Sequence, residues 1–481
     1  MGQSSKPARL SPYKVAGEYM KRRTLLKTGA AGFAGACFPT LSLAMGSADK
    51  TSKAEYDYIL TAEPAKARIA KGGDSDILGF NGQFPAPVIR AKQGKPLRVL
   101  FINKLDEATT VHWHGIRIEN SMDGVPHLTQ PPIEAGESFL YEFTCPDAGT
   151  FWYHPHMNSV EQLGKGLVGA LIVEEETPQD YHDVVIGLKD WRLKNDGSYL
   201  PLSIPREAFR DGTLGTIATV NGQQKPTIEV PAGERLRLRF LNMDNTRVFN
   251  LSMRDNAAQI IAIDGSPIDK PVPLDVHPTG AGMRLDVGFI CPSEIAKEIP
   301  IYDMKGRFGV EICRLKTVAP AKKISKKTGI PALPINPIPA PQLASAESLS
   351  FVFEWAGALS PSDAQGQVVH NFWLINRRAW SDHSHQHLPE PLAVLSLGKT
   401  YIFELHNATP HHHPIHLHGL IFTVLESDKK TITPFHTDTI LLEKNERAKI
   451  AFVADNPGKW MFHCHVIEHM KTGLMGYITI A

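Results

Sequence analysis

Four short histidine-rich blocks are the feature of this sequence that most suggests chemistry. Each contains two histidines with the spacing His-x-His: His112 and His114, His154 and His156, His416 and His418, and His463 and His465. Neutral imidazole is a common ligand of transition metals. A single histidine is usually a satisfied core residue, but four repeated pairs indicate one shared site with more ligands than a single metal ion requires.

The His-x-His spacing has a simple explanation if the blocks lie on strands. Their flanks, such as "TTVHWHG" and "GTFWYHPH", are aromatic and β-branched, which favours strands. Residues i and i+2 of a strand point to one face and residue i+1 to the other. Each pair therefore aims two imidazoles the same way. The eight rings can converge only if the first and last parts of the chain pack together.

Cys464 stands between His463 and His465, so alternation directs its sulfur to the opposite face of the strand. There it can join His413 and His469 in a trigonal set of two imidazoles and one thiolate, which is the ligand set of a blue-copper electron-transfer site. A zinc site with paired CxxC spacing and a thiol-protease nucleophile both fit these neighbours less well. One strand would then connect an electron-accepting copper ion on one face with a metal cluster on the other.

Three similar segments indicate how the supporting elements are organised. They are "FNGQFPAPVIRAKQGKPLRVLFIN", "VNGQQKPTIEVPAGERLRLRFLN" and "INRRAW…LAVLSLGKTYIFELHN". Each passes from an Asn turn through a short strand and a Gly turn to an alternating strand that ends in Asn, which predicts three all-β units. We place the units at residues 55–176, 180–317 and 349–481, with a Lys- and Pro-rich linker over residues 318–348. The third unit carries an insertion with His383, His385 and His387.

The charge balance argues against a nucleic-acid partner, because 51 basic and 50 acidic side chains leave a net charge of only +1.

The N-terminal segment has the features of an export signal. Residues 1–44 contain Arg22-Arg23, an apolar run and the small-residue ending Ser42-Leu43-Ala44, which is typical of a twin-arginine signal peptide. We therefore expect a periplasmic protein with no membrane contact beyond the export machinery. A retained anchor and a lipoprotein at Cys37 are the alternatives.

Four cysteines remain after cleavage at Ala44: Cys145, Cys291, Cys313 and Cys464. Too few are present for a disulfide scaffold, although an oxidising periplasm would permit one bridge. Cys291 and Cys313 are the candidate pair. Buried free thiols are the equally open alternative for both.

In their order and spacing, the four histidine blocks resemble the signature of the multicopper oxidases, a family that includes laccases, bacterial copper-defence oxidases and ferroxidases. The segments "TQPPI", "RLDVGF" and "DNPGKW" also match patterns of that family, so the resemblance covers nearly the whole mature chain. It implies three cupredoxin-like Greek-key β-sandwich or barrel domains and four copper ions. A type 1 copper would lie in the third domain, and one type 2 and two type 3 coppers would lie between the first and third.

The resemblance also implies roles for individual residues. His413, Cys464 and His469 are similar to type 1 ligands, and His112 and His416 to type 2 ligands. The type 3 positions are matched by His114, His154, His156, His418, His463 and His465. Asp123 resembles the family's acidic residue near the cluster, which takes part in proton delivery, although a turn aspartate before Gly124 remains an alternative.

Two positions depart from the bacterial pattern. Bacterial relatives often carry a carboxylate directly after the last type 1 histidine, whereas this sequence has Met470, which puts one proton route in doubt. The axial methionine of those relatives falls on Leu474, so we expect a non-ligating axial leucine and a raised reduction potential. A register slip that lets Met475 coordinate the copper is the alternative.

The function implied is one-electron oxidation of a substrate at type 1 copper, coupled to four-electron reduction of dioxygen to water. We expect phenols or aromatic amines as substrates, with electron transfer through an exposed edge of His413 or His469. A periplasmic cuprous oxidase is the alternative, for which "DHSHQH" and His411-His412 could gather metal ions. A non-catalytic copper-binding cupredoxin is the alternative from another class, although no ligand position is missing.

Overall fold

The computed structural model describes residues 56–254, 256–306, 308–322, 327–357, 370–380 and 388–481. The expected export signal over residues 1–44 and the inserted histidines His383, His385 and His387 lie outside these ranges. Among the described helices, none combines the length and apolar character needed to cross a membrane.

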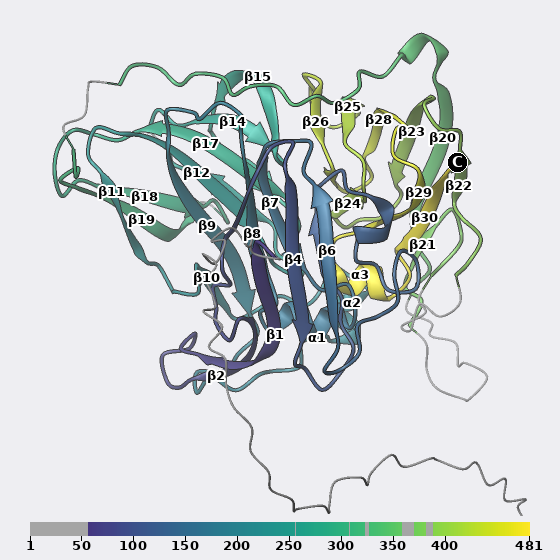
Figure 1. Ribbon diagram of the computed structural model, residues 1–481, viewed down its shortest axis with the longest axis horizontal. Coiled ribbons are helices and arrows are strands. Elements are labelled where there is room, and N and C mark those ends of the chain that lie inside the picture. Colours follow the sequence, from purple (N-terminus) through teal and green to yellow (C-terminus); the bar gives the residue numbers. More distant parts are fainter. Residues whose placement is uncertain (1–55, 255, 307, 323–326, 358–369, 381–387) are drawn as a thin grey trace, which may run out of the picture. The chain divides into compact units, whose positions relative to one another are not determined.

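The first region is a sandwich of two four-stranded sheets, with strand orders β2-β1-β4-β6 and β3-β8-β7-β5 (Figure 1). Strand β4 shows why: its residues alternate between buried and more exposed positions, as expected for a strand with one face on a core. The elements are β1 (Tyr58–Ala67), β2 (Ser75–Phe80), β3 (Ile89–Lys92), β4 (Pro96–Asn103), β5 (His112–His114), the 3-10 helix η1 (Asn120–Met122), β6 (Ser138–Thr144), β7 (Gly149–His154), α1 (Ser159–Gly164) and β8 (Gly169–Glu174).

The second region pairs a six-stranded sheet, β10-β9-β12-β17-β14-β15, with a five-stranded sheet, β11-β19-β18-β13-β16. Its elements are β9 (His182–Trp191), α2 (Pro205–Ala208), β10 (Ile217–Val220), β11 (Thr227–Pro231), β12 (Arg235–Asn242), β13 (Phe249–Ser252), β14 (Gln259–Ile263), β15 (Ser266–Pro273), β16 (His277–Thr279), β17 (Arg284–Ile290), β18 (Glu298–Asp303) and β19 (Val310–Val318).

The third region repeats this plan with sheets β21-β20-β23-β28-β25-β26 and β22-β30-β29-β24-β27. Its elements are η2 (Leu343–Ser345), β20 (Glu347–Trp355), β21 (Trp373–Ile375), β22 (Ala393–Leu395), β23 (Thr400–Asn407), β24 (His413–Leu417), β25 (Phe422–Ser427), β26 (Phe435–Thr437), β27 (Thr439–Leu442), β28 (Arg447–Val453), β29 (Gly458–Cys464), α3 (Ile467–Lys471) and β30 (Met475–Ile480). The expected all-β class with three cupredoxin-like sandwiches is confirmed. The residue limits of the three units stay a proposal.

The three similar sequence segments perform the same structural task in each sandwich. The turn residues Asn81, Asn221 and Asn376 have φ values of 54°, 48° and 49°, in the left-handed region that asparagine tolerates. In every copy the short strand joins one sheet and the following strand joins the other. Each segment therefore carries the chain across its sandwich.

The asparagine that ends each segment anchors a loop. The side-chain amide of Asn103 donates to the carbonyl oxygens of Glu107 and Ile133, both at 2.9 Å. The amide of Asn407 donates to the carbonyl oxygens of His411 and Glu443, both at 2.7 Å. These fully buried amides fix the loops that lead into the first and third histidine blocks.

The first and third sandwiches share one apolar core, which includes both Trp113 and Phe462. Polar contacts support the junction, because the Asn456 amide donates to the carbonyl oxygen of Ile118 at 2.8 Å. Asn456 belongs to the turn "DNPGKW" that resembled a family pattern. The segments next to β5 and β29, the strands that carry histidine blocks, are thereby joined.

Candidate metal centres

Eight histidines converge between the first and third sandwiches. Strand β5 pairs with β7 so that His112 lies opposite His154, and β24 pairs with β29 so that His416 lies opposite His463. Rings from the two regions interleave: the ring centroids of His112 and His418 are 3.9 Å apart in a stacked arrangement. Each of the eight side chains is no more than 2 % exposed. The convergence expected from strand alternation is observed.

The ring nitrogens of these histidines fall into three groups, each with its ligand atoms within 4.8 Å of one another. The groups are His112, His114 and His416; His114, His154 and His465; and His156, His418 and His463. Together, the last two groups contain the six residues that the family resemblance implies as type 3 ligands, and the first contains the implied type 2 pair. The assignment of single copper types remains a proposal.

The hydrogen bonds of the rings show which nitrogens are available to a metal ion. The Nδ1 atoms of His112 and His416 lie 2.8 Å and 2.9 Å from the carbonyl oxygens of Asp123 and Asp438. The Nδ1 of His154 lies 3.0 Å from the carbonyl oxygen of the next residue. A carbonyl oxygen only accepts, so Nδ1 carries the proton and Nε2 keeps its lone pair in all three rings.

Those three Nε2 atoms are buried and have no hydrogen-bond partner among the described groups. Burying an unsatisfied polar atom is costly, so a set of them at one point indicates a missing ligand. Metal-bound histidines characteristically donate their other N–H to a carbonyl or carboxylate oxygen, as these do. The donor set fits bound copper ions.

Asp123 lies against this cluster. Its carboxylate is fully buried, and Oδ2 lies 3.0 Å from the Nδ1 of His418. The same residue therefore contacts two of the eight histidines, His418 through its carboxylate and His112 through both its carbonyl oxygen and its carboxylate. A turn aspartate serving only Gly124 would not need this contact.

A second carboxylate, Asp438, was not identified from the sequence. Its Oδ1 lies 3.2 Å from the Nε2 of His114 and 3.3 Å from the Nδ1 of His416. Arg284 of the second sandwich donates to both of its oxygens, at 2.9 Å and 2.6 Å. The nearby Arg284 guanidinium and the His416 N–H hold the pKa of Asp438 well below its ordinary value despite burial.

The structure explains why a glycine, Gly115, follows the first histidine pair. Its φ is +88°, and a Cβ atom there would lie 2.3 Å from an Arg284 guanidinium nitrogen and 2.7 Å from Asp438 Oδ2. Only glycine lets the β5 turn approach this ion pair. The second sandwich, which carries none of the predicted ligands, thus reaches the cluster through Arg284.

The predicted trigonal set is assembled on the opposite face of β29. The Nδ1 atoms of His413 and His469 each lie 3.6 Å from Cys464 Sγ and 3.1 Å from each other. The Nε2 of His469 lies 2.8 Å from the carbonyl oxygen of Arg210, and the Nε2 of His413 lies 2.9 Å from Thr409 Oγ1. The His469 bond fixes the proton on Nε2, which leaves its Nδ1 lone pair facing the sulfur.

Burial controls the protonation of this set. It lowers the pKa of His469 to about 3 and that of His413 well below its ordinary value, and it raises the pKa of the Cys464 thiol. Neutral imidazoles are ready to coordinate a cation, whereas the thiol needs the metal ion's charge to give up its proton.

The strand register favours Leu474 over Met475 as the neighbour of Cys464. In the pairing of β29 with β30, Met475 is opposite His463 and therefore shares the face of the histidine cluster. The backbone N–H of Cys464 donates to the carbonyl oxygen of Leu474 at 3.0 Å, and Leu474 is fully buried. This register opposes the alternative in which Met475 coordinates.

The prediction that His413 or His469 has an exposed edge is wrong. Both rings are 0 % exposed. The segment after α2 covers them, because the Arg210 carbonyl oxygen accepts the His469 N–H and Asp211 Oδ1 lies 2.9 Å from the Nδ1 of His411. The sequence does not show this cover, since it comes from the second sandwich, some 200 residues away.

Glu468 fastens the same segment. One of its carboxylate oxygens accepts from the hydroxyls of Ser203 and Thr213, at 2.6 Å and 2.9 Å, and the other accepts from the Thr213 backbone N–H. Met470 packs in an apolar cluster with Trp152. Where bacterial relatives often have a carboxylate that can move protons, this protein therefore has an apolar side chain that packs in the core.

Cys291 and Cys313 are both buried free thiols, as is Cys145. Burial raises the pKa of Cys291 and Cys313 to about 12. The sequence allowed either a disulfide between Cys291 and Cys313 or two buried free thiols, and the structure has the free thiols.

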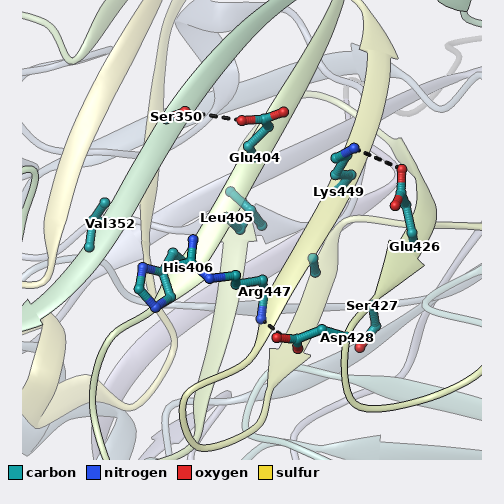
Figure 2. Close-up of a pocket in the computed structure, with 11 residues that line it drawn as sticks. Ser350, Val352, Glu404, Leu405, His406, Glu426, Ser427, Asp428, Arg447 and Lys449 are labelled. Carbon is teal, nitrogen blue, oxygen red and sulfur yellow. Dashed lines mark hydrogen bonds and ion pairs between the residues drawn. The ribbon is translucent and has the colours of Figure 1, made fainter.

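A surface hollow of about 560 Å³ lies on the outer face of the third sandwich, on β20, β23, β25 and β28 (Figure 2). Its carboxylates already have partners: Lys449 Nζ lies 3.0 Å from Glu426 Oε1, the Arg447 backbone N–H donates to Asp428, and the Ser350 hydroxyl donates to Glu404. None of the predicted ligands lines it, so we do not regard it as the functional site.

Comparison with known proteins agrees with this geometry. Three family models described as "Multicopper oxidase" match residues 61–178, 182–289 and 362–481. A multi-copper oxidase from Pseudomonas thermotolerans is similar at 43 % identity and a TM-score of 0.81, over 88 % of this chain and 98 % of that one. A multi-copper oxidase from Pseudomonas parafulva is similar at 44 % identity and a TM-score of 0.79, over 88 % and 100 %.

Among curated relatives, the "Multicopper oxidase mco" of Staphylococcus epidermidis is 29 % identical over 90 % of both chains. The matched regions contain all the converging histidines, Cys464 and Asp123. The chain therefore belongs to the multicopper oxidase family, whose members are copper-dependent enzymes that couple substrate oxidation to the reduction of dioxygen.

Proposed function

We propose that this protein is a laccase-like oxidase of phenols and aromatic amines that holds four copper ions. His413, Cys464 and His469 would hold one ion, and the eight-histidine cluster would hold three. The bound ions supply one-electron redox chemistry at the first site and the binding and four-electron reduction of dioxygen at the second.

The protein's own part in electron transfer is the connection between the two sites. Cys464 is flanked by His463 and His465, so two backbone routes lead from its sulfur to the cluster. The Nδ1–H of His463 donates to the Cys464 carbonyl oxygen at 2.9 Å, which adds a hydrogen-bonded shortcut to the covalent path. Electrons that enter singly at Cys464 can thus accumulate at the cluster.

Protons are needed where dioxygen is reduced, and Asp123 is placed to deliver them. Its carboxylate contacts the outer N–H of His418, while Asp438 is occupied by Arg284 on both oxygens. Asp123 therefore has the freer carboxylate of the two and is our candidate for proton transfer.

The observation that carries the choice of substrate is Leu474 in register with Cys464. A thioether there would stabilise Cu(II), so an apolar leucine favours a high reduction potential. Phenols and aromatic amines are poor reductants that require such a potential. A relative in Botryotinia fuckeliana, 29 % identical over 82 % of this chain, is named "Laccase-2".

Oxidation of a metal ion is the second candidate, supported by the Asp211–His411 pair beside the covered site, in which the Asp211 side chain is 64 % exposed and that of His411 15 %. These two side chains offer an oxygen and a nitrogen to a cation. A relative in Candida albicans, 28 % identical over 83 % of this chain, is named "Iron transport multicopper oxidase FET3".

Oxygen uptake distinguishes the two candidates. We expect kcat/KM with 2,6-dimethoxyphenol to exceed the values with Cu(I) and Fe(II), and the double variant Asp211→Asn, His411→Gln to keep its phenol activity. A preference for Cu(I) by orders of magnitude, lost in the double variant, would replace the laccase assignment with metal-ion oxidation.

We also propose a periplasmic location, supported by Arg22-Arg23 and the cleavage-type ending at Ala44. The double variant Arg22→Lys, Arg23→Lys should retain the uncleaved protein in the cytoplasm. Cell fractionation and the mass of the mature chain measure this, and unchanged export would refute the twin-arginine route.

A further inference from the structure

A buried tryptophan lies directly on the Cys464 site. The ring of Trp373 is centred 4.4 Å from the ring of His469 and 5.0 Å from that of His413, and it is 0 % exposed. Its indole N–H donates to the carbonyl oxygen of Ala208 at 2.9 Å. This bond fixes the orientation of the indole against both histidines.

A second tryptophan connects Trp373 with the surface. Trp355 lies opposite Trp373 in the pairing of β20 with β21. Side chains opposite each other in an antiparallel pair share a face, with Cβ atoms about 4.5–5.5 Å apart. Trp355 is 46 % exposed. The Trp355–Trp373 pair thus leads, through neighbouring positions on two strands, from the exposed surface toward the ligands.

Phe209 completes an aromatic surface beside Trp355. The rings of Phe209 and Trp355 are stacked at 19°, with centroids 6.2 Å apart, and Phe209 meets Phe372 edge-on at 5.6 Å. The Arg210 guanidinium lies 5.5 Å from the centre of the Phe209 ring. The surface offers a flat aromatic group on one side and a cation on the other.

These contacts matter because the direct route is closed. The Nε2 of His469 is bonded to the Arg210 carbonyl oxygen and both histidine rings are buried, so a donor molecule has no access to their edges. Electron transfer weakens steeply with distance through saturated or empty space, and aromatic side chains along the way shorten the saturated part of the path. Trp355, an exposed tryptophan whose cross-strand partner Trp373 contacts both histidine rings, is the best remaining point of access.

We propose that Trp355 is the docking platform for aromatic electron donors and that the Trp355–Trp373 pair couples a docked donor to His469 and His413. The proposal rests on the phenol oxidase function proposed above. A phenol stacked on Trp355 loses one electron and its hydroxyl proton and becomes a phenoxyl radical. The electron passes through the two indoles to the oxidised Cys464 site, and the proton goes to solvent water.

Binding is tested apart from turnover. The full-length copper-loaded protein, labelled with 5-fluorotryptophan and kept reduced and anaerobic, is titrated with 1,2-dimethoxybenzene, which has no phenolic hydroxyl. The ¹⁹F resonance that is absent in Trp355→Phe should shift saturably. No shift of this resonance at a concentration that inhibits phenol oxidation competitively would overturn the docking site.

Kinetics test the electron route. Trp355→Ala should lower kcat/KM for 2,6-dimethoxyphenol about tenfold, equivalent to about 1.4 kcal/mol, while kcat/KM for ferrocyanide and the blue absorption band stay unchanged. Trp355→Phe, which keeps a ring against Phe209, should lie between. Phe308→Ala removes another exposed aromatic side chain, at 75 % exposure, from the second sandwich and is the control.

The outcomes separate the two proposals. Phenol kcat/KM in Trp355→Ala equal to wild type would overturn the Trp355 route and leave the oxidase function standing. A wild-type protein that oxidises no phenol, but still shows the saturable shift, would overturn the proposed function and retain the docking site.

Discussion

The backbone N–H of Cys464 donates to the carbonyl oxygen of Leu474, which brings the backbones of these two residues together at the end of the β29–β30 pair. The next residue, Met475, faces the histidine cluster on the other side. A single step in register therefore decides whether a sulfur donor is available to the Cys464 site.

Exchanging Leu474 for methionine should lower the reduction potential of this site by about 59 mV or more, equivalent to about 1.4 kcal/mol for one electron. The reason is that a thioether stabilises the oxidised ion. Redox titration of the blue absorption band measures it. Met475→Leu is the control and should leave the potential unchanged, because its side chain lies on the opposite face. The register would be contradicted if the reduction potential fell in neither variant, or if it changed only in Met475→Leu.

Replacing Gly115 with alanine should disturb the cluster more than the fold. The added Cβ would collide with the Arg284–Asp438 pair, and the residue would also be strained at φ +88°. Gly136→Ala supplies the control, since Gly136 has φ +83° but no neighbour within 4 Å of a Cβ. We expect a loss of about 1–3 kcal/mol from strain in both variants. Only Gly115→Ala should also alter the electron paramagnetic resonance of type 2 copper.

Asp123→Asn should slow the reduction of dioxygen by about 10²–10⁴-fold, the usual contribution of a general acid. The amide oxygen can still accept from His418, so the geometry of the cluster is preserved. Stopped-flow measurements separate the steps: reduction of the blue band by substrate should be unaffected, and reoxidation by oxygen should be slow. Asp275→Asn, at an exposed turn, should change neither rate. Equal slowing of both steps in Asp123→Asn would indicate a structural defect instead.

Removing copper should make the stability of the protein depend on pH below about 6.5. In the folded state burial lowers the pKa of His469 to about 3, whereas the unfolded chain titrates near 6.5. Between these values the unfolded state binds more protons, so the free energy of unfolding falls as pH falls and is constant above pH 6.5 or so. His469 alone contributes up to about 5 kcal/mol over this window.

The melting temperature of the copper-free protein at pH 8, 6 and 4 checks this expectation. The copper-loaded protein is the control, because bound copper competes with protons for the same nitrogens and should delay the loss to lower pH. A melting temperature of the copper-free protein that stays level from pH 8 to pH 4 would show that the histidines are not buried in neutral form.

The local sequence pattern of this chain was enough to predict much of the fold and most of the candidate ligands. His-x-His pairs and Cys464 could be assigned to opposite faces because alternation is a property of a single strand. The repeated Asn turns at Asn81, Asn221 and Asn376 likewise marked equivalent crossings between sheets, because the left-handed conformation is a requirement of one residue. Such features need no knowledge of distant neighbours.

Tertiary structure alone decided what surrounds those ligands. Arg284 binds Asp438, and the Arg210 backbone covers His469. Trp373 lies against His413 and His469, the two histidines grouped with Cys464. Each of these contacts joins segments far apart in the sequence. The sequence therefore determined which side chains can hold copper, since that depends on local chemistry. The packing of three sandwiches decided which edges are buried, which carboxylates are paired and where an electron donor has access, because these depend on which surfaces meet.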